Sequence, residues 1–382
     1  MGRSGTYIKQ LTGYRAFIPS ALPPDPPLDQ NQAMNRLLAD ATLAIGRLDG
    51  AIQNLPNPDL FVYMYVRKEA VLSSQIEGTQ SSLSHLLEAE AELFDAQRPK
   101  DVPEVINYVR AMNYGLERLR ELPVSVRLIR EIHKELLQNV RGQELSPGDL
   151  RTSQNWIGPA GCTLSEARFV PPPPDILSQC LGDLEEFFHQ HDGNHDLVRI
   201  GLAHAQFETI HPFLDGNGRV GRLLITFLLC EKNILEKPAL YLSHYFKANR
   251  QEYYDRLQAI RDNGDWEGWL VFFLTGVKSV SEEATLTARR IVHLREDHRK
   301  YIQSNFGARA GNATIILERL YEQPILQVNA AVDLLNVSYP VANKIVTALA
   351  EAGIIREITG QYRNRVFEYT PYIDLFSDRN AS

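Results

Sequence analysis

The sequence predicts a mainly α-helical protein, because apolar residues recur with a helical period of 3.6 over most of its length. Strand-like patterns are confined to a short hairpin near the middle of the chain and another near its end. Of the 382 residues, 44% are hydrophobic, which is sufficient for packed cores. The length is typical of two or three domains.

The bulk composition argues against several classes of protein. A net charge of −7 excludes a whole-chain nucleic-acid or membrane-surface binder, although a local basic patch is still compatible with it. The three cysteines form no zinc-binding pattern, and unpaired thiols fit a reducing compartment. The first residues lack the apolar core of a signal peptide, and the longest apolar runs are far below the ~18 residues of a membrane span. We therefore expect a cytoplasmic protein without a membrane segment.

The first predicted domain, 1–105, combines an irregular start with helices. Residues 1–30 are expected to be irregular because they contain a proline-rich stretch that neither a helix nor a central strand accepts. Helical periodicity then runs from Asn31 to about Phe94, with breaks at Pro56 and Pro58 and further helices over Phe61–Ile76 and Ser82–Ala96.

The second predicted domain, 106–305, is helical around one hairpin. Helices are expected over 102–121, 124–139, 175–191, 197–210 and 219–231, followed by a helix-rich stretch to Asn305. Between them, Asn155–Ile157 and Arg168–Val170 read as the two strands of a β-hairpin, which the four prolines 171–174 end.

The third predicted domain, 306–382, resembles a winged helix-turn-helix. Three helices are expected over 314–321, 329–335 and 339–352, and two strands follow over 354–358 and 366–369.

The charges of this domain leave its partner open. The polar front of its third helix and the wing would suit a DNA backbone, through Ser338, Tyr339, Asn343, Lys344, Arg363 and Arg365. Acidic side chains at Asp333, Glu351 and Glu357 dilute the basic field. A protein-binding or homodimer-forming role is therefore favoured, and DNA binding through 311–371 stays an alternative.

The most informative segment is residues 211–222, with the sequence HPFLDGNGRVGR. Pro212 should end the preceding helix at His211, where the helix C-terminus tends to raise the basicity of an imidazole that can act as a general base. Glycines before a new helix let backbone N–H groups approach a phosphate. Asp215 is placed to hold Mg²⁺, and Arg219 and Arg222 can bind phosphate oxygens. The segment therefore predicts a site for a metal-bound polyphosphate beside an activated hydroxyl.

This segment, of the form HPFxDGNGRxxR, resembles the core motif of the Fic (filamentation-induced-by-cAMP) family. The resemblance implies a helical Fic core with a β-hairpin flap and an enzyme that transfers AMP from ATP to Ser, Thr or Tyr hydroxyls of proteins, including itself. It implies that His211 is the base and Asp215 the magnesium ligand. The nucleotide is then held by Gly216, Asn217, Gly218, Arg219, Val220, Gly221 and Arg222, with Asn217 at the α-phosphate and the arginines at the β- and γ-phosphates.

Two positions in the motif distinguish this chain from the Doc-like members of the family. Doc-like members, which resemble kinases, carry Lys in place of Gly218 and lack the second arginine, whereas this chain has both Gly218 and Arg222. The resemblance therefore favours attack at the α-phosphorus with pyrophosphate leaving, because two arginines and Mg²⁺ neutralise the leaving group.

A second motif lies at Ser73–Gly78 and resembles the inhibitory (S/T)xxxE(G/N) pattern of many Fic proteins. The resemblance implies an N-terminal inhibitory helix, about 59–78, on which Ser73 and Glu77 act. Glu77 is expected to form a salt bridge with Arg222 and so to oppose productive ATP binding. A glutamate on a solvated last turn is the alternative interpretation of this short pattern.

The hairpin at 156–174 resembles the family's flap, on which a target protein docks as an added strand near Phe169 and Val170. These two residues and Arg168 are also expected near the nucleotide, and Tyr253 or Tyr254 near adenine, although aromatic residues at helical spacing also suit a core. Two rival functions remain: removal of AMP from modified proteins, with Glu77 positioning water, and a DNA-binding regulator whose Fic core senses nucleotide.

Overall fold

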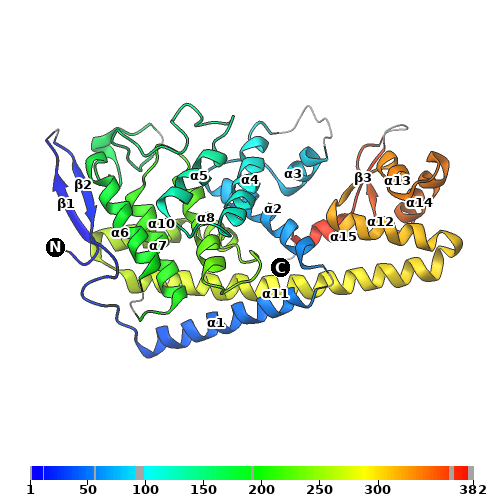
Figure 1. Cartoon of the computed structure of the whole chain (residues 1–382), viewed down its shortest axis with the longest axis horizontal. Helices are drawn as coiled ribbons and strands as arrows, with labels where there is room; N and C mark the ends of the chain where they lie inside the picture. Colours follow the sequence, from blue (N-terminus) through cyan, green and yellow to red (C-terminus); the bar gives the residue numbers. More distant parts are fainter. Residues whose placement is uncertain are drawn as a thin grey trace.

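A computed structural model of the chain describes residues 2–11, 13–55, 57–91, 99–159, 161–190, 193–360 and 365–376. The mainly helical prediction is confirmed (Figure 1). The longer helices are α1 (Gln32–Gln53), α2 (Pro58–Ile76), α3 (Leu83–Glu90), α4 (Val102–Arg118), α5 (Val126–Leu136), α6 (Leu177–His189), α7 (Asp196–Ile210), α8 (Asn217–Glu231), α10 (Arg250–Asn263), α11 (Trp266–Asn305), α12 (Ala310–Glu322), α13 (Val328–Leu335) and α14 (Tyr339–Glu351). The short α9 (Ser243–Ala248) and α15 (Thr370–Ile373) complete the set. No helix of the described residues is both long and apolar enough to cross a bilayer.

Helix α11 is the longest element, with 40 residues and a length of about 60 Å at 1.5 Å per residue. Its first half lies along the helical bundle, with α1 beside it, and its second half extends to the C-terminal helices (Figure 1). Helices α12, α13 and α14 therefore sit at one end of the molecule, whereas the last described residues return to α2, where Tyr372 donates to the carbonyl of Leu60 at 3.4 Å.

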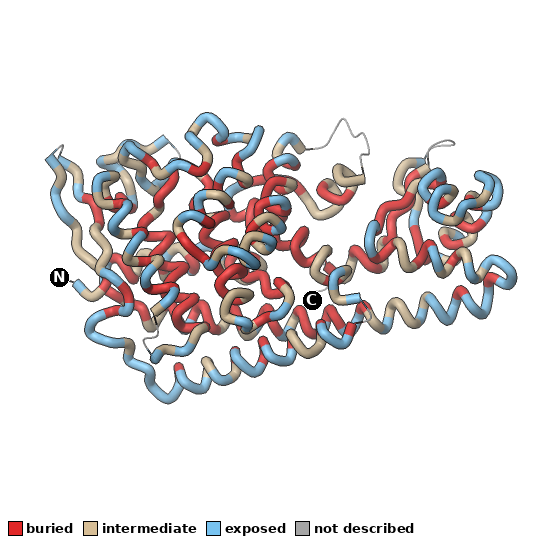
Figure 2. The backbone as a smooth tube through the Cα atoms, in the orientation of Figure 1, coloured by how far each residue is buried: buried red, intermediate tan, exposed pale blue. Residues whose placement is uncertain are grey.

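Helices α7 and α8 form the centre of the bundle. Every residue from Leu197 to Ile210 is buried, and so are nearly all residues of α8, which is why neither helix shows a polar face in its sequence. The burial is concentrated in this bundle, whereas one side of α1 and the far half of α11 are exposed (Figure 2). The segment 211–216 joins α7 to α8, so the predicted site is built on the two most buried helices.

The helix boundaries follow local capping signals. Asn57 caps α2 by accepting a hydrogen bond from the N–H of Asp59, and the helix stops before Gly78, whose φ is +101°. Ser82 and His85 form a capping box at the start of α3. Pro56 and the predicted end of this last helix, within 92–98, lie outside the described residues.

The prediction that residues 1–30 are irregular was wrong for the first 19. Strands β1 (Gly5–Lys9) and β2 (Arg15–Pro19) pair antiparallel, with Tyr7 opposite Phe17. The aromatic and β-branched residues of these two five-residue strands are too few to show a clear period-2 pattern in the sequence. The N–H of Phe17 donates to the carbonyl of Val170 at 2.9 Å, so β2 lies against the flap.

The flap is less regular than predicted. The only antiparallel pairing between its two strand-like pieces is the bridge of Ile157 and Phe169, and a 3₁₀ turn over Leu164–Glu166 follows in place of a tight hairpin turn; this holds for the described residues, which omit Ala160. Pro159 and Pro171 lack the N–H groups that further pairs would require. The two strand-like pieces of the flap are therefore paired with each other at one point in its described part.

The C-terminal part contains the predicted succession of three helices and two strands. A further strand, β3 (Ile325–Gln327), completes a three-stranded antiparallel sheet with the order β3-β5-β4, where β4 is Arg356–Glu357 and β5 is Val366–Glu368. The predicted wing contact Arg363 lies outside the described residues. The assignment of this region as a winged helix-turn-helix stays a prediction.

Candidate active site

A cavity of about 520 Å³ opens between the flap, the end of α7, the start of α8 and helix α10. It brings together several residues that the sequence analysis selected: Glu77, Arg168, Phe169, His211, Gly218, Arg222, Tyr253 and Tyr254. These residues come from five separate segments of the chain. The remaining lining comes from α7 through Glu208 and, in equal parts, from α10 and the flap: Arg250, Leu257, Gln258 and Arg261, and Trp156, Ile157, Gly158 and Pro159.

His211 is the C-cap of α7, with φ of 49° and ψ of 60° in the left-handed region. Its carbonyl accepts hydrogen bonds from Arg151 Nε at 2.9 Å and from Asn155 Nδ2 at 3.3 Å. Arg151 also donates to the carbonyls of Pro172 and Ile210, so it satisfies the carbonyls that the helix end leaves unpaired. These contacts hold the backbone of the expected base in one position.

Burial lowers the pKa of His211 to about 3, and the positive charges of Arg261 and Arg151 act in the same direction. The prediction that the helix C-terminus raises its basicity was therefore wrong, because desolvation outweighs the helix dipole at this site. The imidazole is uncharged at neutral pH, and its buried Nδ1 has no hydrogen-bond partner among the described residues. A neutral ring is the form that can accept a proton.

The turn between α7 and α8 is closed by its own side chains. Asn217 accepts a hydrogen bond from the N–H of Phe213 at 2.9 Å and donates one to its carbonyl at 2.8 Å. Gly216, with φ of +76°, provides the left-handed N-cap that starts α8. The Asn217 side chain thus closes the turn, and the N–H of Gly216 is also used, since it donates to Asp215 Oδ1 at 2.6 Å. The expected contact of Asn217 with an α-phosphate stays a prediction.

His133, which the sequence analysis missed, supports this turn from α5. Its ring stacks on Phe213 with centroids 3.7 Å apart and forms a hydrogen bond with the carbonyl of Asp215 at 3.0 Å. The N–H of Gly148 donates to the other ring nitrogen, so the ring is uncharged, in agreement with a pKa that burial lowers to about 4.

Arg219 does not line the cavity. Its buried guanidinium lies 3.3 Å from the carboxylate of Glu104 and 3.6 Å from that of Asp215. In this structure it therefore pairs with these two carboxylates. Oδ1 of Asp215 takes part in this pair, whereas Oδ2 forms no hydrogen bond or ion pair with the described residues. Mg²⁺ is usually held by one or two carboxylates together with substrate phosphates, so a single carboxylate beside the turn fits the ion. No group of three or more acidic, histidine or cysteine ligands occurs in the described part of the chain.

Arg222 is fully engaged by the predicted inhibitory helix. Its Nε donates to Ser73 Oγ at 2.8 Å, and Nη2 donates to the Ser73 carbonyl at 3.0 Å and to Glu77 Oε1 at 2.7 Å. Burial alone would raise the pKa of Glu77, but the attraction of Arg222 outweighs burial and the pKa lies below its usual value. The predicted salt bridge between Glu77 and Arg222 is thus present as geometry, and the two hydrogen bonds of Ser73 to Arg222 are a further finding.

The two tyrosines differ in their surroundings. Tyr253 is buried, stacks on Phe246 at 4.5 Å and shares a hydrogen bond of 2.9 Å with His204, whose other nitrogen bonds to the carbonyl of Gly221. Tyr253 is therefore a core residue that forms the wall of the cavity. Tyr254 is only partly buried, so it is the tyrosine available to a ring in the cavity.

Glu208 is the residue of the cavity that sequence reasoning should have weighed and did not. It lies one helical turn before His211, it is buried, and its Oε1 has no hydrogen-bond partner among the described residues. Burial raises its pKa to about 7. The available signal was a carboxyl group one helical turn before the expected base.

Several other residues that were expected to hold the nucleotide or its metal do not line the cavity: Asp215, Gly216, Asn217, Val220, Gly221 and Val170. Gly221 packs so closely on Glu208 that a Cβ would lie 2.4 Å from its Oε1. Val170 lies on the other side of the flap, against β2.

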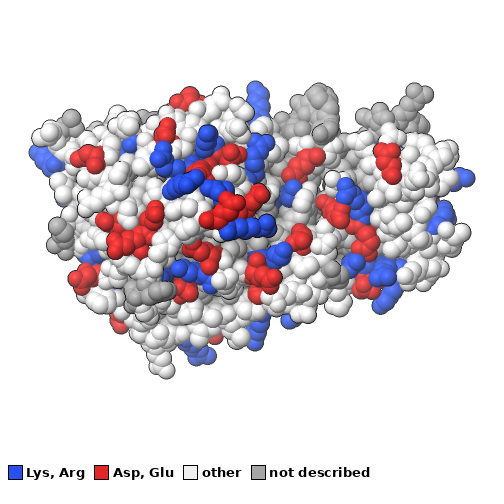
Figure 3. All heavy atoms as spheres, in the orientation of Figure 1, with Lys and Arg blue, Asp and Glu red and all other residues white. Residues whose placement is uncertain are grey.

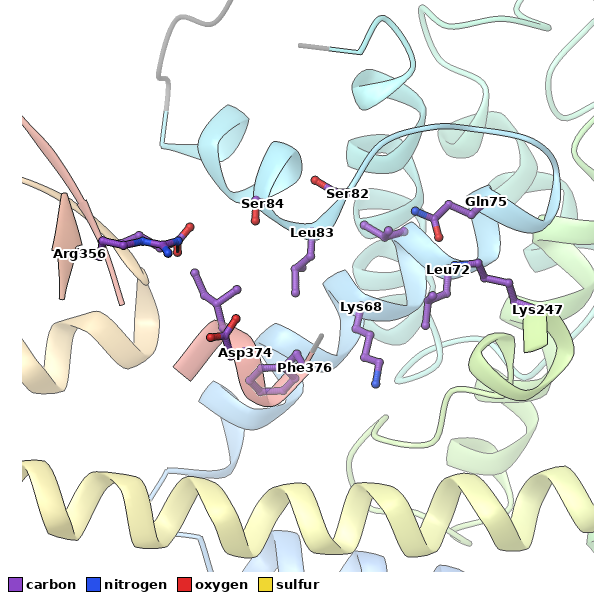
Figure 4. A pocket seen from close by; sticks show the side chains of 13 residues that line it. Lys68, Leu72, Gln75, Ser82, Leu83, Ser84, Lys247, Arg356, Asp374 and Phe376 are labelled. Carbon is purple, nitrogen blue, oxygen red and sulfur yellow. Dashed lines mark hydrogen bonds and ion pairs between the residues drawn. The ribbon is translucent and has the colours of Figure 1, made fainter. Parts of the chain in front are cut away.

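A separate cavity of about 360 Å³ lies on the opposite side of α2, between this helix, the start of α3 and the C-terminal sheet (Figure 4). Lys68 and Arg356 line it, but they already form ion pairs with Glu283 at 2.9 Å and Glu368 at 3.2 Å. None of the residues 211–222 reaches this cavity. It is therefore not the polyphosphate site.

Comparison with known proteins agrees with the resemblance seen in the sequence. Residues 35–117 match the Fic/DOC family N-terminal model, and residues 123–229 match the Fic/DOC family model. These matches place the chain in the Fic family. The helical fold is also found in a crystal structure of a Fic family protein from Desulfovibrio desulfuricans, with a TM-score of 0.57 at 20% identity over 89% of this chain and 96% of that one.

Among named relatives, a protein adenylyltransferase Fic from Drosophila grimshawi is 27% identical over 232 residues, which are 59% of this chain and 43% of that protein. A probable protein adenylyltransferase from Aquifex aeolicus is 28% identical over 201 residues, which are 50% of this chain and 56% of that protein. The chain thus spans about half the length of these relatives.

Proposed function

We propose that the protein is a protein adenylyltransferase that transfers AMP from ATP to a Ser, Thr or Tyr hydroxyl of a protein and releases pyrophosphate. The observation that carries this proposal is the convergence of His211, Gly218 and Arg222 on one cavity. Two relatives of the chain carry the name of this activity.

In the proposed reaction, the target hydroxyl attacks the α-phosphorus and passes its proton to the uncharged imidazole of His211. A bond forms between the hydroxyl oxygen and phosphorus, and the bond to the bridging oxygen of pyrophosphate breaks. The backbone N–H groups at the start of α8 and the guanidinium of Arg222 stabilise the phosphate charges. Mg²⁺, held by Asp215, would neutralise the leaving pyrophosphate.

The same site includes a proposed inhibitor. Arg222 can neutralise a terminal phosphate only when it is released from Glu77, whose carboxylate would repel that phosphate. Glu77 therefore suppresses transfer until helix α2 shifts or the pair is broken. Self-modification is the expected outcome when no other target is present.

Two alternatives use the same chain differently. Hydrolytic removal of AMP would employ Glu77 to position water, and this role is compatible with its 32% exposed side chain. DNA binding by 311–371 is less well supported, because Arg365 is already bonded to Asn343 and lies 3.5 Å from Glu357. On the face shown in Figure 3, acidic and basic side chains are interspersed over this region, which also suits a protein partner or a second copy.

The direct test is incubation of the protein with ATP labelled at the α-phosphate, comparing wild type with Glu77→Gly. Label on protein that rises in the variant and disappears in Glu77→Gly/His211→Ala supports transfer. Label that is removed from a modified protein by the wild type, without any transfer by the variant, would favour the hydrolytic alternative. If label is neither transferred to protein nor removed from modified protein, both the transfer and the hydrolytic alternative are overturned.

A further inference from the structure

The N-terminal hairpin and the flap enclose a groove of about 1070 Å³ outside the nucleotide cavity. The hairpin lines it with Tyr7, Tyr14 and Arg15, the flap with residues 163–165 and 167–170, and α10 with Gln258 and Asp262. Arg168, Phe169 and Gln258 line both this groove and the nucleotide cavity. The groove therefore leads to the site that contains His211.

The hairpin is firmly attached to the rest of the protein. Arg3 forms two hydrogen bonds of 2.7 Å with Glu267 of α11, and Tyr7 donates to Asp262 of α10 at 3.2 Å. Gln206 of α7 donates to the carbonyl of Ser20 at 2.7 Å. Because contacts with three helices fix it, the hairpin can act as a rigid wall of the groove.

The hairpin also occupies part of the flap. In the flap, Phe169 exchanges both backbone hydrogen bonds with Ile157, and the carbonyl of Val170 accepts from the N–H of Phe17. On the expected docking edge, the carbonyl of Val170 is therefore already paired within the chain, which leaves less of that edge for a target strand.

The unpaired edge in the groove belongs to β2. The N–H of Gln10 donates to the carbonyl of Tyr14, and the N–H of Ser20 donates to that of Ser4, which fixes the alternation of the β1–β2 ladder. By this alternation, the N–H and C=O of Arg15 and Phe17 point away from β1. Phe17 uses its N–H on the flap, whereas no backbone hydrogen bond among the described residues uses the N–H of Arg15. Figure 1 shows β1 outermost and β2 facing the bundle.

The Arg15 side chain adds a charge to this edge. It is exposed, its guanidinium lies 5.5 Å from the ring of Tyr7, and it forms no ion pair within the described part of the chain. The other arginine of the groove, Arg168, is bound to Asp255 at 2.6 Å. Arg15 is thus the cation that an acidic side chain in the groove would meet.

We propose that this groove binds an extended segment of the target protein, which pairs with the backbone of Arg15 and carries an acidic side chain near the hydroxyl to be modified. Edge pairing of this kind fixes the register of an extended chain and leaves most of its side chains unconstrained. The proposal rests on the proposed AMP transfer and specifies how that site selects its target.

The test uses the full chain with Glu77→Gly and compares it with Glu77→Gly/Arg15→Pro and Glu77→Gly/Lys9→Pro. Proline removes the N–H and is tolerated on edge strands. Lys9 lies directly opposite Arg15 with its backbone turned away from the groove, so it is the matched control. The probes are synthetic peptides with a central Ser, Thr or Tyr and acidic or basic flanks, labelled from α-labelled ATP.

Arg15→Pro should lower peptide labelling about tenfold, as expected for the loss of a well-formed hydrogen bond and of the strand register that it fixes, and should leave ATP affinity unchanged. Lys9→Pro should label peptides as well as Glu77→Gly alone. Arg15→Ala in the same background should abolish any preference for acidic flanks. Equal labelling by the two proline variants, or an unchanged preference in Arg15→Ala, would overturn the groove as the docking site. If the Glu77→Gly chain labels no peptide and no protein, the proposed transfer itself fails.

Discussion

Glu77 Oε1 accepts a hydrogen bond from Arg222 Nη2 at 2.7 Å, and it does so directly over the Cα atom of Gly218. The guanidinium is 1% exposed and is held from the other side by Ser73. Breaking this contact leaves a buried cation without a carboxylate, which is strongly unfavourable unless an anion replaces it. A terminal phosphate is such an anion, so Glu77 and the nucleotide compete for one partner.

Glu77→Gly should raise AMP transfer by at least about tenfold, because it removes the competing carboxylate and leaves Arg222 for the phosphate. Arg222→Ala should transfer poorly, and the double variant should be no better than Arg222→Ala alone. Label incorporation from α-labelled ATP measures all three. A double variant as active as Glu77→Gly would show that Arg222 is not the group that Glu77 blocks.

Gly218→Ala also tests the contact between Glu77 and Arg222, because the added methyl group would displace the Glu77 carboxylate. A Cβ at this position would lie 2.3 Å from Glu77 Oε1 and 3.1 Å from Arg222 Nη1, so the carboxylate has to move away. We expect basal transfer above that of wild type but below that of Glu77→Gly, because the added methyl group also narrows the phosphate site. Gly182→Ala, where a Cβ would meet nothing within 4 Å, is the control and should leave transfer unchanged. Wild-type activity in Gly218→Ala would contradict this account of the clash.

His211→Ala in the Glu77→Gly background should reduce transfer by about 10²–10⁴-fold and leave ATP affinity nearly unchanged, because the imidazole acts on the hydroxyl proton. Since burial lowers the pKa of His211 to about 3, the imidazole stays uncharged from pH 5.5 to 8. Transfer by Glu77→Gly should therefore show no acid limb near pH 6.5. A rate that halves near that pH would indicate an ordinary, solvated histidine.

The local elements of the site were predictable because their signals lie within short segments. Pro212 marked the end of α7, and Gly216 supplied the positive φ that starts α8. The apolar residues of 197–210 indicated one buried face of α7, whereas the structure buries the polar residues of this helix as well. The order and spacing of residues 211–222 also indicated which side chains would meet.

The supporting residues were not predictable, because they act across long sequence separations. Arg151 and His133 fix the turn from 60 and 82 residues away in the chain, and nothing in their own neighbourhoods marks them. The position of His211 at a helix C-terminus predicts a raised pKa, but its burial, which depends on the tertiary structure, lowers it. Similarly, β2 lies against the flap through a bond that joins residues 17 and 170, so the packing that supports the N-terminal hairpin is not visible in its own sequence.

Glu208 provides a prediction about stability and pH. Burial raises its pKa from the usual 4.5 to about 7, so the folded protein keeps the proton over a range in which the unfolded chain loses it. The contribution of this group to the free energy of unfolding is therefore greatest below pH 4.5, decreases as the pH rises, and is completely lost above pH 7. A rise from 4.5 to about 7 corresponds to about 3 kcal/mol.

Glu208→Gln keeps the shape of the protonated carboxyl group but cannot ionise. The variant should be more stable than wild type at pH 8, by up to about 3 kcal/mol, and should differ little at pH 5. Urea unfolding at the two pH values measures this difference. Glu252→Gln is the matched control, because this exposed residue of α10 pairs with Arg256 at the surface and should change stability by the same small amount at both values. If Glu208→Gln shifts stability equally at pH 5 and pH 8, then the carboxyl group is not held protonated by burial in the folded protein.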